Sequence, residues 1–92
     1  MAHLNSIRAH IKRGQFKELP MPKHGSSAVR RLLYIKDLEV LCVVWVGSSN
    51  MYAYQDVPVG KAKHLVSLVN GNRRIGTYVS KSIKAQHLAK VV

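Results

Sequence analysis

The sequence predicts an α+β domain in which a three-stranded antiparallel β-meander is followed by helices packed on the sheet, with a short basic N-terminal helix. Three observations lead to this prediction. Three short apolar runs lie close together in the middle of the chain, an amphipathic helical stripe follows them, and another stands near the N-terminus. With 92 residues, 47% of them hydrophobic, the chain has the size and composition of one small globular domain.

Residues 1–24 are expected to form a basic helix and a Pro/Gly-containing linker ahead of a core that spans residues 25–92. Leu4, Ile7 and Ile11 recur at helical spacing, with basic residues between them. The prolines and glycine that follow favour an extended backbone.

The predicted meander consists of strands at 28–35, 40–46 and 51–55. The segments between them are too short for parallel crossovers, so neighbouring strands should run antiparallel. A helix is predicted over 58–69, and a last helix is expected to start at a Ser80 cap. Their apolar positions are Ala62, Leu65, Val66 and Val69 in the first helix, and Ile83, His87, Leu88 and Val91 in the last.

The second predicted strand is apolar on both faces, which is typical of a strand that is covered on both sides. Leu41, Val43 and Trp45 point one way, and the alternate valines and Cys42 point the other way. The 58–69 helix covers one side only. The other side is left to the N-terminal helix, the C-terminal helix or a second subunit.

The formal net charge of +11 is concentrated at the two ends of the chain. Residues 61–92 carry seven Lys and Arg and no acidic residue, and residues 1–24 carry a net charge of +4, whereas residues 25–60 are neutral. Charge repulsion of this size opposes compaction and usually serves an anionic partner. Nucleic acid is therefore the first candidate.

Several short motifs occur together in residues 26–83. They are Ser26-Ser27-Ala28-Val29, Tyr34, the alternating Leu41, Val43 and Trp45, Gly47, Tyr52-Ala53-Tyr54, Val57-Pro58, and the later Gly76, Tyr78 and Ile83. In order and spacing they resemble the KTSC domain, a module named for its place at the C-terminus of some lysyl-tRNA synthetases and also found as a stand-alone protein. The resemblance implies a small α+β fold and an RNA-binding role, so RNA is preferred to DNA.

The candidate nucleic-acid-binding residues are basic side chains of the C-terminal third, extended by the N-terminal helix. Guanidinium and ammonium groups suit phosphate oxygens, and the loop before Ser80 is flexible and basic. Engagement of about five phosphates would make the logarithm of affinity fall with the logarithm of salt at a slope near −4. The residues are Arg73, Arg74, Lys81 and Lys84, with Lys61 and Lys63, and with Arg8, Lys12 and Arg13.

Tyr52 and Tyr54 lie two apart on a predicted strand, so both rings project from one face. They could form a platform on which unpaired bases stack. The alternative is that both rings pack under the following helix. The second reading is favoured, because the two rings continue the alternation that begins at Val43 and Trp45. Trp45 is expected in the core.

The remaining composition argues against a metal site, a cofactor and catalysis. The five histidines lack zinc-site spacing, Cys42 is expected to be a core residue, and no paired carboxylates or phosphate loop occur, so we expect no metal, no cofactor and no enzyme activity. A single cysteine and no membrane-length apolar run fit a cytoplasmic protein. The alternative function is a protein-interaction module. It would dock on an acidic surface of a larger enzyme, or homodimerise, through the outer face of the second strand.

Overall fold

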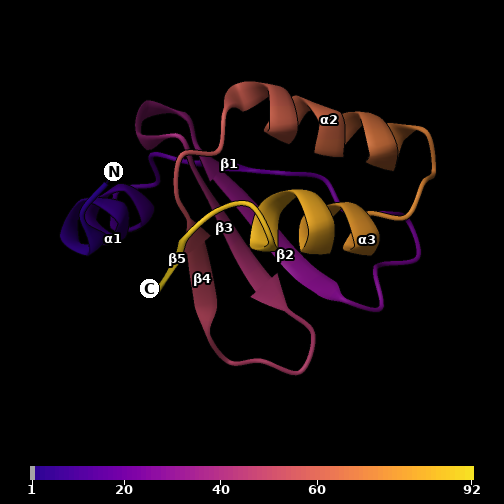
Figure 1. Cartoon of the computed structure of the whole chain (residues 1–92), viewed down its shortest axis with the longest axis horizontal. Helices are drawn as coiled ribbons and strands as arrows, with labels where there is room; N and C mark the ends of the chain where they lie inside the picture. Colours follow the sequence, from indigo (N-terminus) through magenta and orange to yellow (C-terminus); the bar gives the residue numbers. More distant parts are fainter. Residues whose placement is uncertain (1) are drawn as a thin grey trace.

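The computed structural model describes residues 2–92 and is α+β, with one five-stranded antiparallel sheet in the order β1-β2-β3-β4-β5 (Figure 1). The strands are β1 (Lys17–Glu18), β2 (Val29–Ile35), β3 (Val40–Trp45), β4 (Met51–Tyr54) and β5 (Ala89–Val91). The helices are α1 (Leu4–Lys12), α2 (Val59–Asn70) and α3 (Gly76–Tyr78), which continues into the π-helical η2 (Val79–Lys84); a 3₁₀ turn, η1 (Lys36–Leu38), links β2 to β3. The prediction of a three-stranded meander followed by helices is wrong, because strands stand both before and after α2 and α3.

The middle of the sheet is the predicted antiparallel meander of β2, β3 and β4. Leu41 of β3 lies between Tyr34 and Tyr54, and Val43 lies opposite Tyr52. The β2–β3 connection ends at Glu39 in the left-handed conformation (φ 51°). These strands coincide with three local apolar runs, which is why the sequence located them.

The strand β1 lies in the segment that was predicted to be a linker. Lys17 pairs with Tyr34 and Glu18 with Leu33, which adds a short edge strand to β2. Glu18 also accepts two hydrogen bonds from the Arg31 side chain, at 2.8 and 2.9 Å. No local apolar alternation marks this strand, since the partner strand alone determines its position.

The C-terminal segment differs most from the prediction. The helix begins at Gly76 rather than at a Ser80 cap and ends at Lys84, and the chain then returns as β5 along the open edge of β4. The backbone N–H of Gln55 donates to Leu88 O at 2.8 Å, ahead of this pairing. Edge pairing satisfies backbone groups of β4 that a longer helix would have left without partners.

Helices cover both faces of the sheet. On one face, α2 and the α3–η2 helix enclose a core that includes Leu65, Val79 and Ile83 with Leu41 and Val43 of β3. On the other face, α1 buries Ile7 completely in a second apolar cluster. That cluster is made of Ile7, Leu33, Ile35, Val40, Cys42 and Ala53.

The N-terminal helix is thus the element that closes the outer face of β3. Val40 and Cys42 are both 0% exposed beneath it. The helix α1 therefore covers the outer face of β3 at Val40 and Cys42, whereas Val44 is half-buried and Val46, directly after the strand, is 52% exposed.

Candidate nucleic-acid interface

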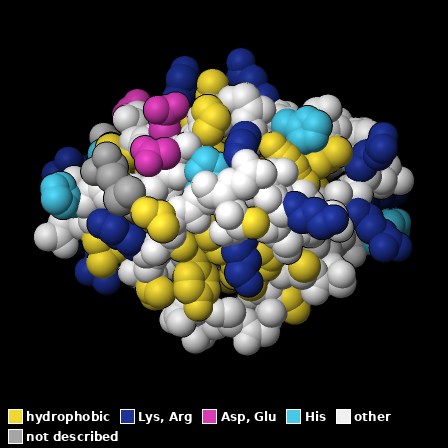
Figure 2. Space-filling view, viewed as in Figure 1, with side chains coloured by type: hydrophobic (Ala, Val, Ile, Leu, Met, Phe, Trp, Pro, Cys, Tyr) yellow, Lys and Arg dark blue, Asp and Glu magenta, His cyan; other side chains and the backbone are white. Residues whose placement is uncertain are grey.

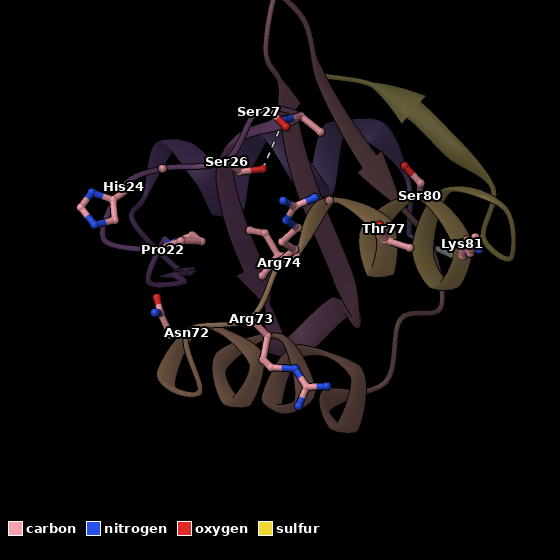
Figure 3. A pocket seen from close by; sticks show the side chains of 14 residues that line it. Pro22, His24, Ser26, Ser27, Asn72, Arg73, Arg74, Thr77, Ser80 and Lys81 are labelled. Atoms are coloured by element: carbon pink, nitrogen blue, oxygen red, sulfur yellow. Dashed lines mark hydrogen bonds between the residues drawn. The ribbon is translucent and has the colours of Figure 1, made fainter.

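A basic concavity of about 750 Å³ lies between the segment 22–28 and the chain that runs from the end of α2 into η2 (Figure 3). Arg74 projects into it toward Ser26, whereas Arg73 turns toward α2 (Figure 3). The residues with hydroxyl or cationic side chains around it are Ser26, Ser27, Thr77, Ser80, Arg73, Arg74 and Lys81. Hydrogen-bond donors and positive charge therefore surround one open space.

The end of α2 determines where the two arginines stand. Asn72 adopts the left-handed conformation (φ 57°), and Arg73 N donates to Leu68 O at 2.8 Å as the helix unwinds. Two residues later, Ile75 is buried (1% exposed) and anchors the chain in the core. Arg73 and Arg74 are thereby held on an exposed span between a helix end and a buried side chain.

Close backbone packing forms the other wall. A Cβ atom on Gly76 would meet the Cβ of Ala28 at 3.1 Å, so α3 approaches the segment before β2 as closely as a glycine allows. Ser26 Oγ accepts hydrogen bonds from Ala28 N (3.2 Å) and Val29 N (3.1 Å), which orders that segment. The wall facing Arg74 is consequently fixed before any ligand binds.

A second, shallower concavity of about 730 Å³ shares Arg73, Arg74 and Lys81 and continues toward His64 and Tyr78. The two rings of His64 and Tyr78 lie 4.6 Å apart between centroids. A phenol is neutral at physiological pH, and burial of the Tyr78 ring raises its pKa further, so this hydroxyl is available as a donor. The three cations therefore face two adjoining hollows.

Acidic side chains are kept away from this region. No carboxylate lines either concavity, and in residues 2–92 the one ion pair joins Glu18 to Arg31 elsewhere in the molecule. Figure 2 shows the visible acidic side chains gathered over the β2–β3 turn and the segment before α2, and basic side chains toward the α2–α3 loop. Both concavities are therefore basic and free of carboxylates, while other basic side chains lie at the α1 end of the molecule.

Lys84 stands beside the concavity rather than in it. Its ammonium group lies over the Trp45 ring, 5.5 Å from the centroid, which is within the range of a cation–π contact. Of the six candidate cations in residues 61–92, the structure brings Arg73, Arg74 and Lys81 together and places Lys84 next to them.

Lys61 has a structural position that the sequence did not predict. Its ammonium donates to Ser82 O (2.8 Å), Gln86 Oε1 (3.0 Å) and His87 Nε2 (2.8 Å), so all three protons are engaged within the protein. The other ring nitrogen of His87, Nδ1, donates to Gln55 O at 2.8 Å. Lys61 thus clamps α2 to the end of η2.

Other predicted cations lie away from the concavity. Lys63 is exposed on α2 beside a separate groove that also holds Lys36 and Asp37. The basic residues of α1 stand on the far side of the sheet, at the opposite end of the molecule from the α2–α3 loop (Figure 1). The structure therefore does not bring the two charged ends of the chain to one place. The residues concerned are Arg8 and Lys12 of α1 and Arg13 directly after it.

The two tyrosines of β4 have different environments. Tyr54 is buried, at 3% exposed, and its Oη accepts a hydrogen bond from Trp45 Nε1 at 3.3 Å. Tyr52 is half-buried at the margin of the same core, as is Trp45. Tyr54 therefore offers no free ring face, whereas Tyr52 and Trp45 are partly open.

No group of three or more His, Cys, Asp and Glu in the described part of the chain is placed to hold a metal ion. Burial raises the pKa of the Cys42 thiol to about 12. Among the helices formed by residues 2–92, none has the length and apolar character needed to cross a membrane. Comparison with known proteins is negative at each level: no protein-family model, no curated protein and no solved structure matches the chain.

Proposed function

We propose that this protein binds nucleic acid, RNA rather than DNA, through phosphate contacts of the basic concavity beside the α2–α3 loop. The observation that carries the proposal is the sharing of one acid-free concavity by Arg73, Arg74 and Lys81, with serine and threonine hydroxyls around it. Lys84 extends the positive surface on one side. The preference for RNA follows from the motif resemblance described above.

The chemistry of these groups suits phosphate oxygens. A guanidinium presents paired N–H donors to two oxygens of one phosphate, and an ammonium acts as a compact charge that tolerates several geometries. Hydroxyl groups such as those of Ser26 and Thr77 donate to a phosphate without adding charge. Both cation types stay charged at neutral pH, so binding should vary with ionic strength and little with pH.

The backbone around the concavity is already ordered in the free protein, so binding costs little conformational entropy. The segment carrying Ser26 is hydrogen-bonded to its own backbone, and α3 packs against it at Gly76. The arginines are flexible side chains on a short anchored span. A partner therefore needs to order the side chains only, which favours affinity.

The test is a titration of fluorescently labelled RNA with the protein across a salt series. Contacts from Arg73, Arg74, Lys81 and Lys84 correspond to about four phosphates, so the logarithm of affinity should fall with the logarithm of salt at a slope near −3 on single strands. Arg74→Gln with Lys81→Gln should reduce that slope to about half.

A matched control is available on α1. Arg8→Gln with Lys12→Gln removes the same charge from exposed positions on the far side of the sheet, and should leave the slope nearly unchanged. Equal losses from both pairs would mean that only total charge matters and would contradict a site. No binding at low salt would overturn the proposal.

A further inference from the structure

We propose that Trp45 and Tyr52 form a stacking surface for an unpaired base, so that the site selects single-stranded nucleic acid. The inference rests on the proposed function, because it assigns the base to a surface beside the phosphate-binding concavity. It concerns two aromatic residues that lie outside that concavity.

Sheet register places the two rings side by side on one face. Tyr52 lies opposite Val43, and Trp45 follows Val43 by two residues on the same strand. Trp45 is therefore a diagonal neighbour of Tyr52, at a separation that aromatic side chains bridge. Both are partly buried at the border of the core, and η2 ends beside them.

The Trp45 ring is held in place before binding. Its Nε1 donates to Tyr54 Oη at 3.3 Å, and Lys84 sits over its face at 5.5 Å from the centroid. A fixed indole loses little freedom when a base stacks on it. A base that stacks on this face displaces the Lys84 ammonium, which then stays beside the ring for the neighbouring phosphate.

The aromatic surface is continuous with the concavity through backbone contacts. Val29 pairs with Trp45, and Val46 N donates to O of Ala28, a residue that lines the concavity, at 2.8 Å. On the opposite wall, η2 carries both Lys81 of the concavity and Lys84 of the aromatic surface. A single-stranded nucleic acid that places one phosphate near Arg74 would therefore run past the aromatic pair.

Apolar side chains border the aromatic pair. Val91, which pairs with Tyr52 across β4 and β5, is 47% exposed. Figure 2 shows hydrophobic side chains between β4 and the α3–η2 helix, with a basic side chain among them. An apolar and aromatic surface next to a cationic hollow matches a nucleotide, whose base is flat and apolar on its faces and whose phosphate is anionic.

Duplexes do not offer this combination, because their bases are already stacked inside the helix. An unpaired base keeps a free face for Trp45 or Tyr52. Stacking on an aromatic side chain typically contributes about five- to a hundredfold in affinity per base. The site should therefore prefer a single strand to a duplex of the same sequence, even though a duplex has the higher charge density.

Trp45 is the sole tryptophan of the chain and reports directly on stacking. Its emission should be quenched by a single-stranded oligoribonucleotide of about ten nucleotides. A duplex of the same sequence should bind at least about fivefold more weakly with little quenching, and inorganic polyphosphate should bind without quenching. A single-stranded deoxyribonucleotide of the same sequence tests whether the 2′-hydroxyl contributes.

The outcomes separate the two proposals. RNA binding with unchanged Trp45 emission and no preference for single strands overturns the stacking surface alone. Failure of both RNA and polyphosphate to bind overturns the phosphate site as well. Tyr52→Leu should weaken single-stranded RNA binding about fivefold and leave polyphosphate binding intact, whereas Tyr52→Phe, which keeps the ring, should bind like the wild type. The wild-type quenching result decides the question if Tyr52→Leu does not fold.

Discussion

Replacement of Ile7 by alanine tests whether the N-terminal helix is an integral part of the fold. Ile7 is 0% exposed and packs against Leu33, Ile35 and Cys42 on the outer face of the sheet. The substitution removes three buried carbon atoms, worth about 0.8 kcal/mol each, and leaves a cavity that adds to the loss. The better helix propensity of alanine returns only a few tenths of a kcal/mol. We expect a net loss of about 2–3 kcal/mol in the free energy of unfolding.

The assay is urea and thermal unfolding followed by Trp45 fluorescence, with a fall in Tm of about 10–20 °C expected for a domain of this size. Cys42 supplies a second readout. Its thiol is fully buried under α1 and its pKa is raised to about 12, so alkylation should be slow in the wild type and faster in Ile7→Ala. Lys12→Ala, an exposed change on the same helix, is the control and should shift stability by under about 0.5 kcal/mol. Unchanged stability and unchanged Cys42 protection in Ile7→Ala would refute the assignment of α1 as the cover of β3.

Two further predictions concern interactions that the fold creates between distant segments. Tyr34 Oη donates to Val57 O at 2.7 Å in a buried site, so Tyr34→Phe should cost about 1–2 kcal/mol in urea unfolding, and no cost would contradict the bond's role. Burial and the Glu39 charge raise the pKa of Tyr34, so its contribution is full below the usual phenol pKa and is lost at higher pH; Tyr34→Phe should lack that alkaline loss. The hydrogen bond from Arg31 lowers the pKa of Glu18, so its contribution is present above the usual carboxyl pKa and is lost as pH falls. Because the pair is about half-exposed, Glu18→Gln should lower stability by less than about 1 kcal/mol at neutral pH and match the wild type in acid, and a difference that persists in acid would point to another cause.

The sequence located those helices and strands that carry an apolar periodicity of their own. The strands β2, β3 and β4 and the helix α2 were located within a residue or two, since each has its own apolar periodicity. The strands β1 and β5 were missed because each forms only by pairing with an edge that exists after the meander has folded. In the C-terminal segment, Ile83 and His87 fit a helical stripe, but pairing along β4 was the stronger constraint.

The candidate site was predictable in part for the same reason. Arg73 and Arg74 are adjacent in sequence, and Lys81 follows within the next helix, so their proximity was foreseeable. The position of the Ser26 segment could not be predicted in this way, because it depends on the close packing of Gly76 against Ala28, which are far apart in sequence. Charge counting also gave no sign that Lys61 donates its protons to groups inside the protein, or that α1 lies on the other side of the sheet.

The sharpest test of the account is a map of the residues that RNA touches. Backbone amide chemical shifts of the full chain should be recorded during a titration with single-stranded RNA at low salt. We predict that the changes concentrate in residues 24–28 and 72–84 and at Trp45 and Tyr52, with α1 unaffected. Changes centred on α1, or spread evenly over the basic residues of both ends, would contradict a phosphate site built around Arg74.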